Sequence, residues 1–190
     1  MSGSDPYVYP DAPAVLKNKF GIKNAERLDK VERRSVVQRV EEGVPRGNFD
    51  LDHLCAIHRH LFQDVYTWAG KTRTVELAKD GDQFHLVAYI QTGMADVHRR
   101  LVQRRFLAGL DAEDFAREVA QIIGDINYVH PFREGNGRTQ MQFLKQLAQR
   151  AGHGIDLTRL HRKQWIEASR AAQLTNYEPM SKAIAGSLKP

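Results

Sequence analysis

The stretch from Ala112 to Val129 constrains the fold of this chain more than any other. Its large apolar residues recur every three or four positions, which places them on one stripe of an α-helix. Asp111 precedes the stretch as a suitable N-cap, and Pro131 must end it because the residue before a proline avoids helical geometry. A helix with such a stripe is predicted to lie centrally in the core. The stripe consists of Phe115, Val119, Ile122, Ile123, Ile126 and Val129.

Helical patterns dominate most of the remaining sequence. Asp50 could cap a helix over residues 51–62, and Gly152 could stop one over residues 136–151. Residues 1–13 hold three of the seven prolines and are predicted to form an irregular arm. We expect a mostly α protein with a single domain over residues 14–190. Further helices are predicted over residues 24–43, 88–109, 162–173 and 179–187.

One segment departs from this helical pattern. The sequence "KTRTVELAKDGDQFHLV", residues 71–87, combines β-branched residues with the dipeptide Asp80-Gly81. This dipeptide favours a tight hairpin because both central residues of the turn need positive φ. A single β-hairpin is therefore predicted ahead of the core helix.

The bulk properties exclude several classes of protein. No apolar run approaches the roughly 18 residues that a membrane span needs, and the first residues lack the pattern of a secretory signal. We therefore expect a cytoplasmic location and no membrane contact. The 28 basic and 23 acidic residues give a net charge of +5, but the arginines are scattered among acids, so no direct contact with nucleic acid is expected. The single cysteine, Cys55, is predicted to be a packing residue.

The sequence "HPFREGNGR", residues 130–138, follows the predicted core helix and leads into the next helix. Unpaired backbone N–H groups and the positive end of the helix dipole favour a bound anion at such a start. Gly135 and Gly137 let the backbone approach a ligand closely. The pattern differs from the Walker motif, because Arg138 follows the second glycine in place of Lys-Ser or Lys-Thr.

The side chains of this loop suit phosphotransfer chemistry. Glu134 is a hard oxygen ligand for magnesium, and Asn136 and Arg138 can donate hydrogen bonds to phosphate oxygens. His130 can take a proton from an attacking hydroxyl. Together they suggest transfer of part of a nucleotide to a hydroxyl. The alternative is an ordinary interhelical turn, in which Glu134 is solvated and pairs with Arg138.

This loop resembles the signature of the Fic family, His-x-Phe-x-Asp/Glu-Gly-Asn-Gly-Arg-x-x-Arg, at every fixed position up to the first arginine. The similarity extends to "DPYVYP" near the start and to "HRHLFQDVYTWAGKTR" before the hairpin. It implies the Fic fold, a helical bundle around a central helix-loop-helix active site with one β-hairpin flap. Within the family the sequence looks most similar to stand-alone Fic toxins that act with a small antitoxin, and relatives at the head of host-targeted effectors share these features.

The resemblance assigns a role to each position of the motif. His130 would deprotonate a Ser, Thr or Tyr hydroxyl of a target protein, and Phe132 would anchor the loop. Glu134 would hold Mg²⁺ on ATP, which is the substrate that donates AMP. The remaining motif residues would bind the nucleotide; they are Gly135, Asn136, Gly137 and Arg138.

The resemblance also gives the hairpin a role, as a flap that pairs with an extended segment of the target. Strand addition of this kind gives affinity with little demand on sequence. The matching segment runs from Thr74 to Phe84, and its docking residues would be Thr74, Val75, Glu76, Leu77, Ala78, Lys79 and Asp80. An ordinary surface hairpin is the alternative.

The sequence departs from the family pattern at Met141, where a second arginine is usual. That arginine steadies the γ-phosphate in the family and is captured by an inhibitory glutamate. We therefore expect ATP to bind more weakly or in a less productive orientation. No inhibitory motif is found in the chain, so the glutamate helix is expected on a partner antitoxin.

The resemblance implies an adenylyltransferase toxin that acts on bacterial type II topoisomerases, which are DNA gyrase and topoisomerase IV. One alternative is a Fic-fold transferase with another donor or transferred group. A second is a regulatory module that binds nucleotide with little chemistry, for which Met141 is the only support in the sequence.

Overall fold

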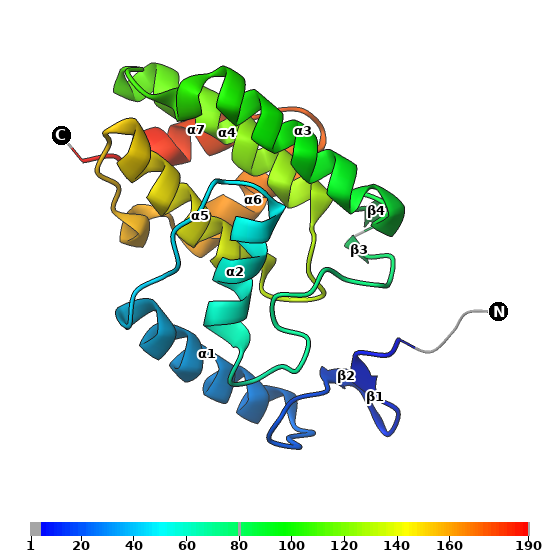
Figure 1. Cartoon of the computed structure of the whole chain (residues 1–190). Helices are drawn as coiled ribbons and strands as arrows, with labels where there is room; N and C mark the ends of the chain where they lie inside the picture. The colour runs from blue at the N-terminus through cyan, green and yellow to red at the C-terminus, as the bar shows by residue number, and fades with distance from the viewer. Residues whose placement is uncertain (1–4, 80, 190) are drawn as a thin grey trace.

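A computed structural model describes residues 5–79 and 81–189 of the chain (Figure 1). Helix α4 (Ala112–Val129) lies at the centre and packs against α3 (Ile90–Gln103), α5 (Asn136–Ala151), α6 (Arg162–Gln173) and α7 (Glu178–Ala185). Helix α2 (Leu51–Phe62) packs against α3 and α5, and α1 (Ala25–Glu41) packs against α2. The mostly α fold class is therefore confirmed. Short 3-10 turns are η1 (Val87–Tyr89), η2 (Arg105–Leu107) and η3 (Leu157–Arg159).

The central position of α4 follows from its apolar stripe. All six predicted stripe residues are buried, and α5 buries its own apolar residues Phe143, Leu144, Leu147, Ala148 and Ala151. Asp111 caps α4 by accepting a hydrogen bond from the backbone N–H of Asp114, and the helix ends one residue before His130. Helix α5 has the predicted bounds, with Gly152 in the left-handed conformation that ends it. Local signals therefore place both helices that flank the loop.

Two predictions about the backbone are wrong. The helix predicted over residues 88–109 ends at Gln103, because Arg105, Phe106 and Leu107 take positive φ values of 51°, 56° and 61°. This turn brings the Phe106 ring to 5.7 Å from the Phe49 ring and to 3.9 Å from the Arg150 guanidinium. Long-range aromatic packing thus overrides helix propensity.

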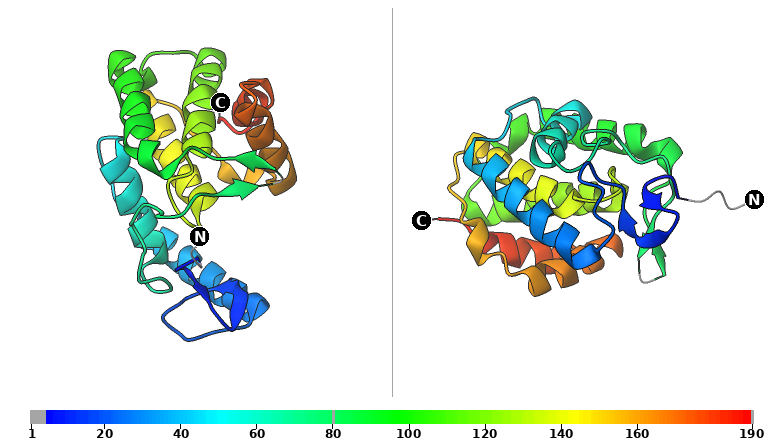
Figure 2. Two further views of the ribbon diagram at one scale, coloured as in Figure 1. Left: turned by 90° about the vertical axis from the view of Figure 1, so that its right-hand side faces the viewer. Right: turned by 90° about the horizontal axis from the view of Figure 1, so that it is seen from below.

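The N-terminal arm is also more regular than predicted. Strand β1 (Val8–Tyr9) pairs antiparallel with β2 (Ala12–Leu16), so the part of residues 1–13 that the structure describes is largely a small hairpin. Tyr7 is buried, and its ring meets the Trp68 ring edge-on at 5.5 Å. This contact fastens the arm to the body, beside α1 (Figure 2, right).

The predicted hairpin is present. Strands β3 (Ala78–Lys79) and β4 (Asp82–Gln83) pair antiparallel, with Ala78 opposite Gln83 and Lys79 opposite Asp82. Gly81 has φ 94°, as the turn requires, while Asp80 lies outside the described residues. The hairpin lies at one edge of the molecule, next to the start of α3 (Figure 1).

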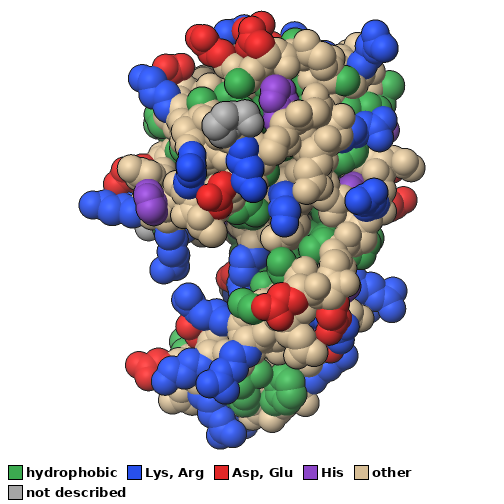
Figure 3. All heavy atoms as spheres, turned by 90° about the vertical axis from the view of Figure 1, so that its left-hand side faces the viewer, with side chains coloured by type: hydrophobic (Ala, Val, Ile, Leu, Met, Phe, Trp, Pro, Cys, Tyr) green, Lys and Arg blue, Asp and Glu red, His purple; other side chains and the backbone are tan. Residues whose placement is uncertain are grey.

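The surface carries basic and acidic side chains in mixture and not in one basic stripe, as one face shows (Figure 3). Many form short-range pairs, such as Arg33 with Asp29 and Lys182 with Glu178. Within the described part of the chain, no helix combines the length and apolar character that crossing a bilayer requires. Cys55 is half-buried and packs against the core as predicted, and burial raises the pKa of its thiol to about 11.

Candidate active site

His130 ends α4 in the left-handed conformation, with φ 47°. Its Nδ1 lies 3.1 Å from the carbonyl oxygen of Asn127, so this nitrogen must carry the proton and donate it. The Nε2 atom is then left with a free lone pair. The ring stacks on Phe84 with 3.7 Å between centroids, and burial lowers the pKa of His130 to about 4. At neutral pH the side chain is an uncharged imidazole that can accept a proton at Nε2.

Asn136 closes the loop that follows. Its Oδ1 accepts a hydrogen bond from the backbone N–H of Phe132 at 3.0 Å, and its Nδ2 donates to the Phe132 carbonyl at 2.7 Å. The side chain is buried, so both ends of the amide hold the loop in shape. A direct phosphate contact by this side chain, as the sequence suggested, stays a prediction.

His58 of α2 holds the backbone of the loop in place. Its Nδ1 accepts the backbone N–H of Gly70 at 2.8 Å, so the proton is on Nε2, which donates to the carbonyl of Glu134 at 3.0 Å. The ring also stacks on Phe132 with 3.9 Å between centroids, and Phe132 is fully buried. Burial lowers the pKa of His58 to about 4. The expected anchoring of Phe132 is therefore present, and His58 completes it.

Gly135 and the start of α5 form the predicted anion-binding end of the loop. Gly135 has φ 81°, and a Cβ there would lie 2.4 Å from Cζ of Phe62, so only glycine fits. The backbone N–H groups of Asn136, Gly137 and Arg138 lie in the first turn, where no intrahelical acceptor exists. A Cβ on Gly137 would meet nothing within 4 Å, which leaves that side open to a ligand. The helix dipole adds positive potential at the same place.

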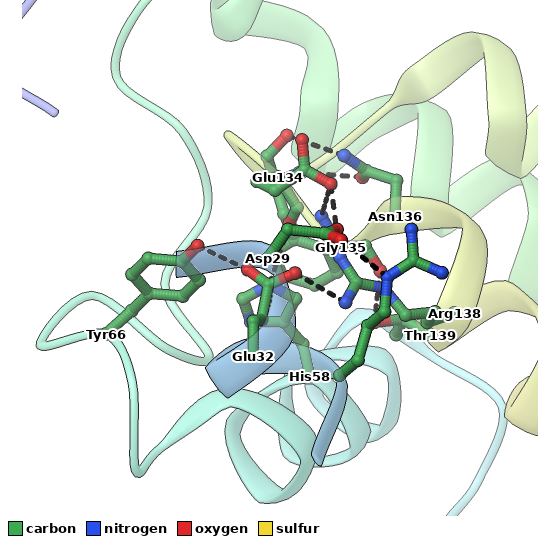
Figure 4. Close-up of polar contacts among 11 residues, drawn as sticks. Asp29, Glu32, His58, Tyr66, Glu134, Gly135, Asn136, Arg138 and Thr139 are labelled. Carbon is green, nitrogen blue, oxygen red and sulfur yellow. Dashed lines mark hydrogen bonds and ion pairs between the residues drawn. The ribbon is translucent and has the colours of Figure 1, made fainter. Parts of the chain in front are cut away.

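Arg138 is held by two carboxylates (Figure 4). Its Nη1 donates to Oε1 of Glu32 at 2.5 Å, and its Nη2 donates to Oε1 of Glu134 at 3.3 Å. Glu32 lies on α1, is buried, and accepts a further hydrogen bond from the Tyr66 hydroxyl. The guanidinium also lies 4.7 Å from the centre of the Phe62 ring. A phosphate that binds Arg138 must share it with these acids.

Glu32 was not predicted as a site residue, although the sequence holds a signal for it. The buried residues of α1 are Leu28, Glu32 and Val36, which are spaced four apart. A glutamate inside an apolar stripe indicates a buried partner, but the neighbouring charges of "VERRS" obscured it.

Glu134 is the predicted metal ligand. Its side chain is about half exposed, at 48%, and its Oε1 accepts hydrogen bonds from the backbone N–H of Gly135 at 2.8 Å and from Nη2 of Arg138 at 3.3 Å. Among residues 5–79 and 81–189, no three His, Cys, Asp or Glu side chains gather where they could hold a metal. One carboxylate suits Mg²⁺ that is held mainly by phosphate oxygens and water. The chemistry of the loop therefore fits the ion that was predicted.

Met141 lies one turn beyond Arg138 on α5 and is half-buried. Its thioether brings no charge to the position where the resemblance implies a second arginine. Arg138 is therefore the one cation that residues 130–141 offer a phosphate from α5.

The flap residues lie beside this loop. Phe84, at the end of the flap, supplies the ring that stacks on His130. Thr74 donates its backbone N–H to the Tyr7 hydroxyl at 3.1 Å, and Glu76 accepts the backbone N–H of Val87 at 3.1 Å. Ala78 and Lys79 are exposed, whereas Val75 and Leu77 are half-buried. The structure thus brings flap and base together, and pairing of the flap with a target stays a prediction.

The site defines a class of protein: a helical protein in which a neutral histidine, an anion-binding helix start and a flap hairpin converge. The chain belongs to the Fic/DOC family, whose model matches residues 48–148. The family and fold that the motif suggested are confirmed.

Three relatives illustrate this similarity. The protein adenylyltransferase VbhT of Bartonella schoenbuchensis is 40% identical over 97% of this chain, which spans only 39% of that protein's length. The "Probable protein adenylyltransferase y4lH" of Sinorhizobium fredii is 38% identical over 86% of this chain and 85% of its own. The BepC protein of Bartonella tribocorum, a VirB-translocated effector crystallised with bound AMPPNP, has a TM-score of 0.87 at 28% identity, covering 97% of this chain and 96% of its own.

Proposed function

We propose that this chain is a protein adenylyltransferase that transfers AMP from ATP to a Ser, Thr or Tyr hydroxyl of a target protein. The observation that carries the proposal is the geometry of His130. Its Nδ1 is committed to Asn127, which leaves Nε2 as a base beside the anion-binding start of α5. Relatives that are named protein adenylyltransferases, and a similar structure with bound AMPPNP, support the same activity.

The residues of the site divide the work. The first backbone N–H groups of α5 and the Arg138 guanidinium bind the phosphates and meet the charge that develops during transfer. Glu134 would hold Mg²⁺, which would supply further charge neutralisation at the phosphates. The target hydroxyl gives its proton to Nε2 of His130 as its oxygen bonds to the α-phosphorus. The bond from that phosphorus to the bridging oxygen breaks, and pyrophosphate leaves with both electrons.

The flap completes the proposal. An extended target segment would pair with the exposed backbone near Ala78 and Lys79, which brings its hydroxyl toward His130. Phe84 shields one face of the imidazole, so the hydroxyl approaches the ring edge at Nε2.

A second candidate function rests on Met141 and on the state of Arg138. Because Arg138 pairs with Glu32 and Glu134, and Met141 adds no charge, the end of the site that would bind the terminal phosphate is weakly cationic. This weak positive charge favours two alternatives. The first is a Fic-fold transferase with another donor or transferred group, and the second is a nucleotide-binding regulatory module.

The biological setting is also a proposal. We infer a cytoplasmic toxin restrained by a small antitoxin that carries the inhibitory glutamate helix, with DNA gyrase or topoisomerase IV as targets. The support is the family signature together with the lack of an inhibitory motif in this sequence. Co-expression with a candidate antitoxin should suppress labelling of the target, and a protein that neither binds nor suppresses it is excluded as the partner.

The activity is tested with purified chain, Mg²⁺ and α-labelled ATP in bacterial lysate and with purified topoisomerases. The control is His130→Asn, because asparagine tolerates the left-handed conformation of this residue. We expect a labelled protein band that falls by about 100-fold or more in the variant.

The other outcomes separate the alternatives. Label from γ-labelled ATP alone would identify a kinase. Label that appears only in Met141→Arg would favour the regulatory module, and label only from another nucleotide would favour the altered donor.

A further inference from the structure

Arg73, just before the flap, has a side chain with no solvent exposure. Its guanidinium donates to four main-chain carbonyls that come from three segments. Nε donates to His130 at 2.8 Å, and Nη1 donates to Val75 at 2.8 Å. Nη2 donates to His85 and, at 3.3 Å, to Val129. One side chain therefore joins the start of the flap, the residue that follows the flap and the C-terminal end of α4.

The charge of Arg73 is balanced in an unusual way. Its only carboxylate partner among the described residues is Glu76, at 3.4 Å, and that side chain is half exposed. The buried cation is chiefly solvated by carbonyl groups, two of which belong to the C-terminal end of α4, where the helix dipole is negative. A lysine would keep the charge, but it could not reach four acceptors in this planar arrangement.

Neighbouring contacts tie the same segments together. The backbone N–H of Arg73 donates to the carbonyl of Pro131 at 2.8 Å, and that of His85 donates to the carbonyl of Tyr128 at 3.0 Å. Phe84, which precedes His85 in the chain, stacks on His130. The guanidinium is at the centre of this arrangement, so it sets where the flap lies relative to the base.

The start of α5 is held by other residues. His58 and Asn136 fix the loop backbone, and Glu32 fixes Arg138. In the described residues, Arg73 makes no hydrogen bond to residues 134–138. Nucleotide binding and flap placement therefore depend on separate sets of contacts.

We propose that Arg73 is a positioning residue that couples the flap to the base: it fixes the path of a bound target segment relative to Nε2 of His130 without contacting the nucleotide. This inference rests on the proposed AMP transfer. It adds a determinant of target binding that lies outside the loop signature.

The kinetic test compares Arg73→Lys with wild type and with Arg117→Lys, which makes the same substitution at a largely exposed arginine of α4. For Arg73→Lys we expect the KM for the target protein to rise by about tenfold or more and kcat to fall, because a displaced hydroxyl reacts slowly. The dissociation constant for ATP should stay within about twofold of the wild-type value, since the substitution does not touch the start of α5. Arg117→Lys should stay close to wild type in all three. A parallel loss of ATP and target binding would mean a general structural role and would overturn the proposal.

A second measurement is independent of activity. Amide hydrogen exchange should become about tenfold faster or more in residues 75–87 of Arg73→Lys, and should not change in residues 136–144. Unchanged exchange in the flap would overturn the proposal. If wild type transfers no AMP, the proposed function fails, but this exchange result still decides whether Arg73 holds the flap. Should Arg73→Lys lack a cooperative thermal transition, Arg73→Gln replaces it, because a neutral amide is cheaper to bury and retains two donors.

Discussion

The loop from His130 to Arg138 and the flap from Thr74 to Phe84 face the same reaction but are built in opposite ways. The loop is held from outside itself, by His58 of α2 and Glu32 of α1, and from within by Asn136. In the described part of the flap, hydrogen bonds to the rest of the protein are made at its base, and its paired residues Ala78, Lys79, Asp82 and Gln83 are all exposed.

This difference follows from what each region meets. A nucleotide presents the same phosphates in every turnover, so donors fixed in advance lower the barrier without reorganising. A protein segment varies in sequence, and an exposed strand edge recognises the backbone that all segments share. Rigid burial therefore suits the loop, and an exposed edge suits the flap.

The largest effect on stability is expected from a substitution at Gly135 of the loop. Gly135→Ala puts a Cβ 2.4 Å from the Phe62 ring at φ 81°, and we expect the free energy of unfolding to fall by about 3 to 4 kcal/mol. Urea denaturation measures this change. The matched control is Gly137→Ala, whose Cβ meets nothing within 4 Å, so stability should change by less than about 0.5 kcal/mol while ATP binding weakens. Equal stability losses in the two variants would refute the account.

Acid should weaken the loop next most strongly. Burial holds the pKa of His58 and His130 at about 4, below the roughly 6.5 of a free histidine. Below about pH 6.5 these two histidines take up protons in the unfolded chain but stay neutral in the folded chain. The free energy of unfolding therefore falls as pH drops from 6.5 to 4. Each histidine contributes about 3 kcal/mol to this loss.

Urea midpoints between pH 7 and 4.5 measure this dependence. His130→Asn should remove about half of the histidine contribution, and comparison with wild type cancels the carboxylates that titrate in both. An identical pH dependence in the two proteins would show that His130 is not held neutral by the fold.

A smaller effect is expected where α1 meets the loop. Glu32→Gln keeps the hydrogen bond from Tyr66 but removes the charge opposite Arg138, at a cost of about 1 to 2 kcal/mol. The same helix offers Asp29→Asn as a control, because the pair of Asp29 with Arg33 is exposed and should contribute under about 0.5 kcal/mol. Thermal and urea unfolding compare the two. Equal stability losses in Glu32→Gln and Asp29→Asn would contradict this prediction.

The smallest effect belongs to the flap tip. Lys79→Ala removes an exposed side chain and no backbone hydrogen bond, so stability should change by less than about 0.5 kcal/mol. The KM for the target should change by less than about threefold if recognition is through the backbone. Steady-state labelling measures it, and a large rise in KM would show that the flap reads side chains.

Sequence patterns predicted the parts of this site that depend on local chemistry. Both bounds of α5 and the turn at Gly81 follow from residues next to them in the chain. The supports could not be predicted in this way, because Arg138 and Glu32 are 106 positions apart and His58 and Glu134 are 76 apart. Periodicity indicates that a side chain is buried but does not name its partner.

The turn at Arg105 to Leu107 shows the same limit. Helical periodicity continued through it, and the chain left the helix because Phe106 packs between Phe49 and Arg150. The N-terminal hairpin likewise depends on burial of Tyr7 against Trp68, which lies 61 positions along the chain.

The half-buried Cys55 has a practical consequence for spectroscopy. With a thiol pKa of about 11, it carries about 300-fold less thiolate at neutral pH than a free cysteine of pKa about 8.5. It is also the only cysteine in the sequence. A Lys79→Cys variant would therefore accept a maleimide dye or spin label at the flap tip almost exclusively, and the wild-type cysteine can stay in place as a nearly silent background.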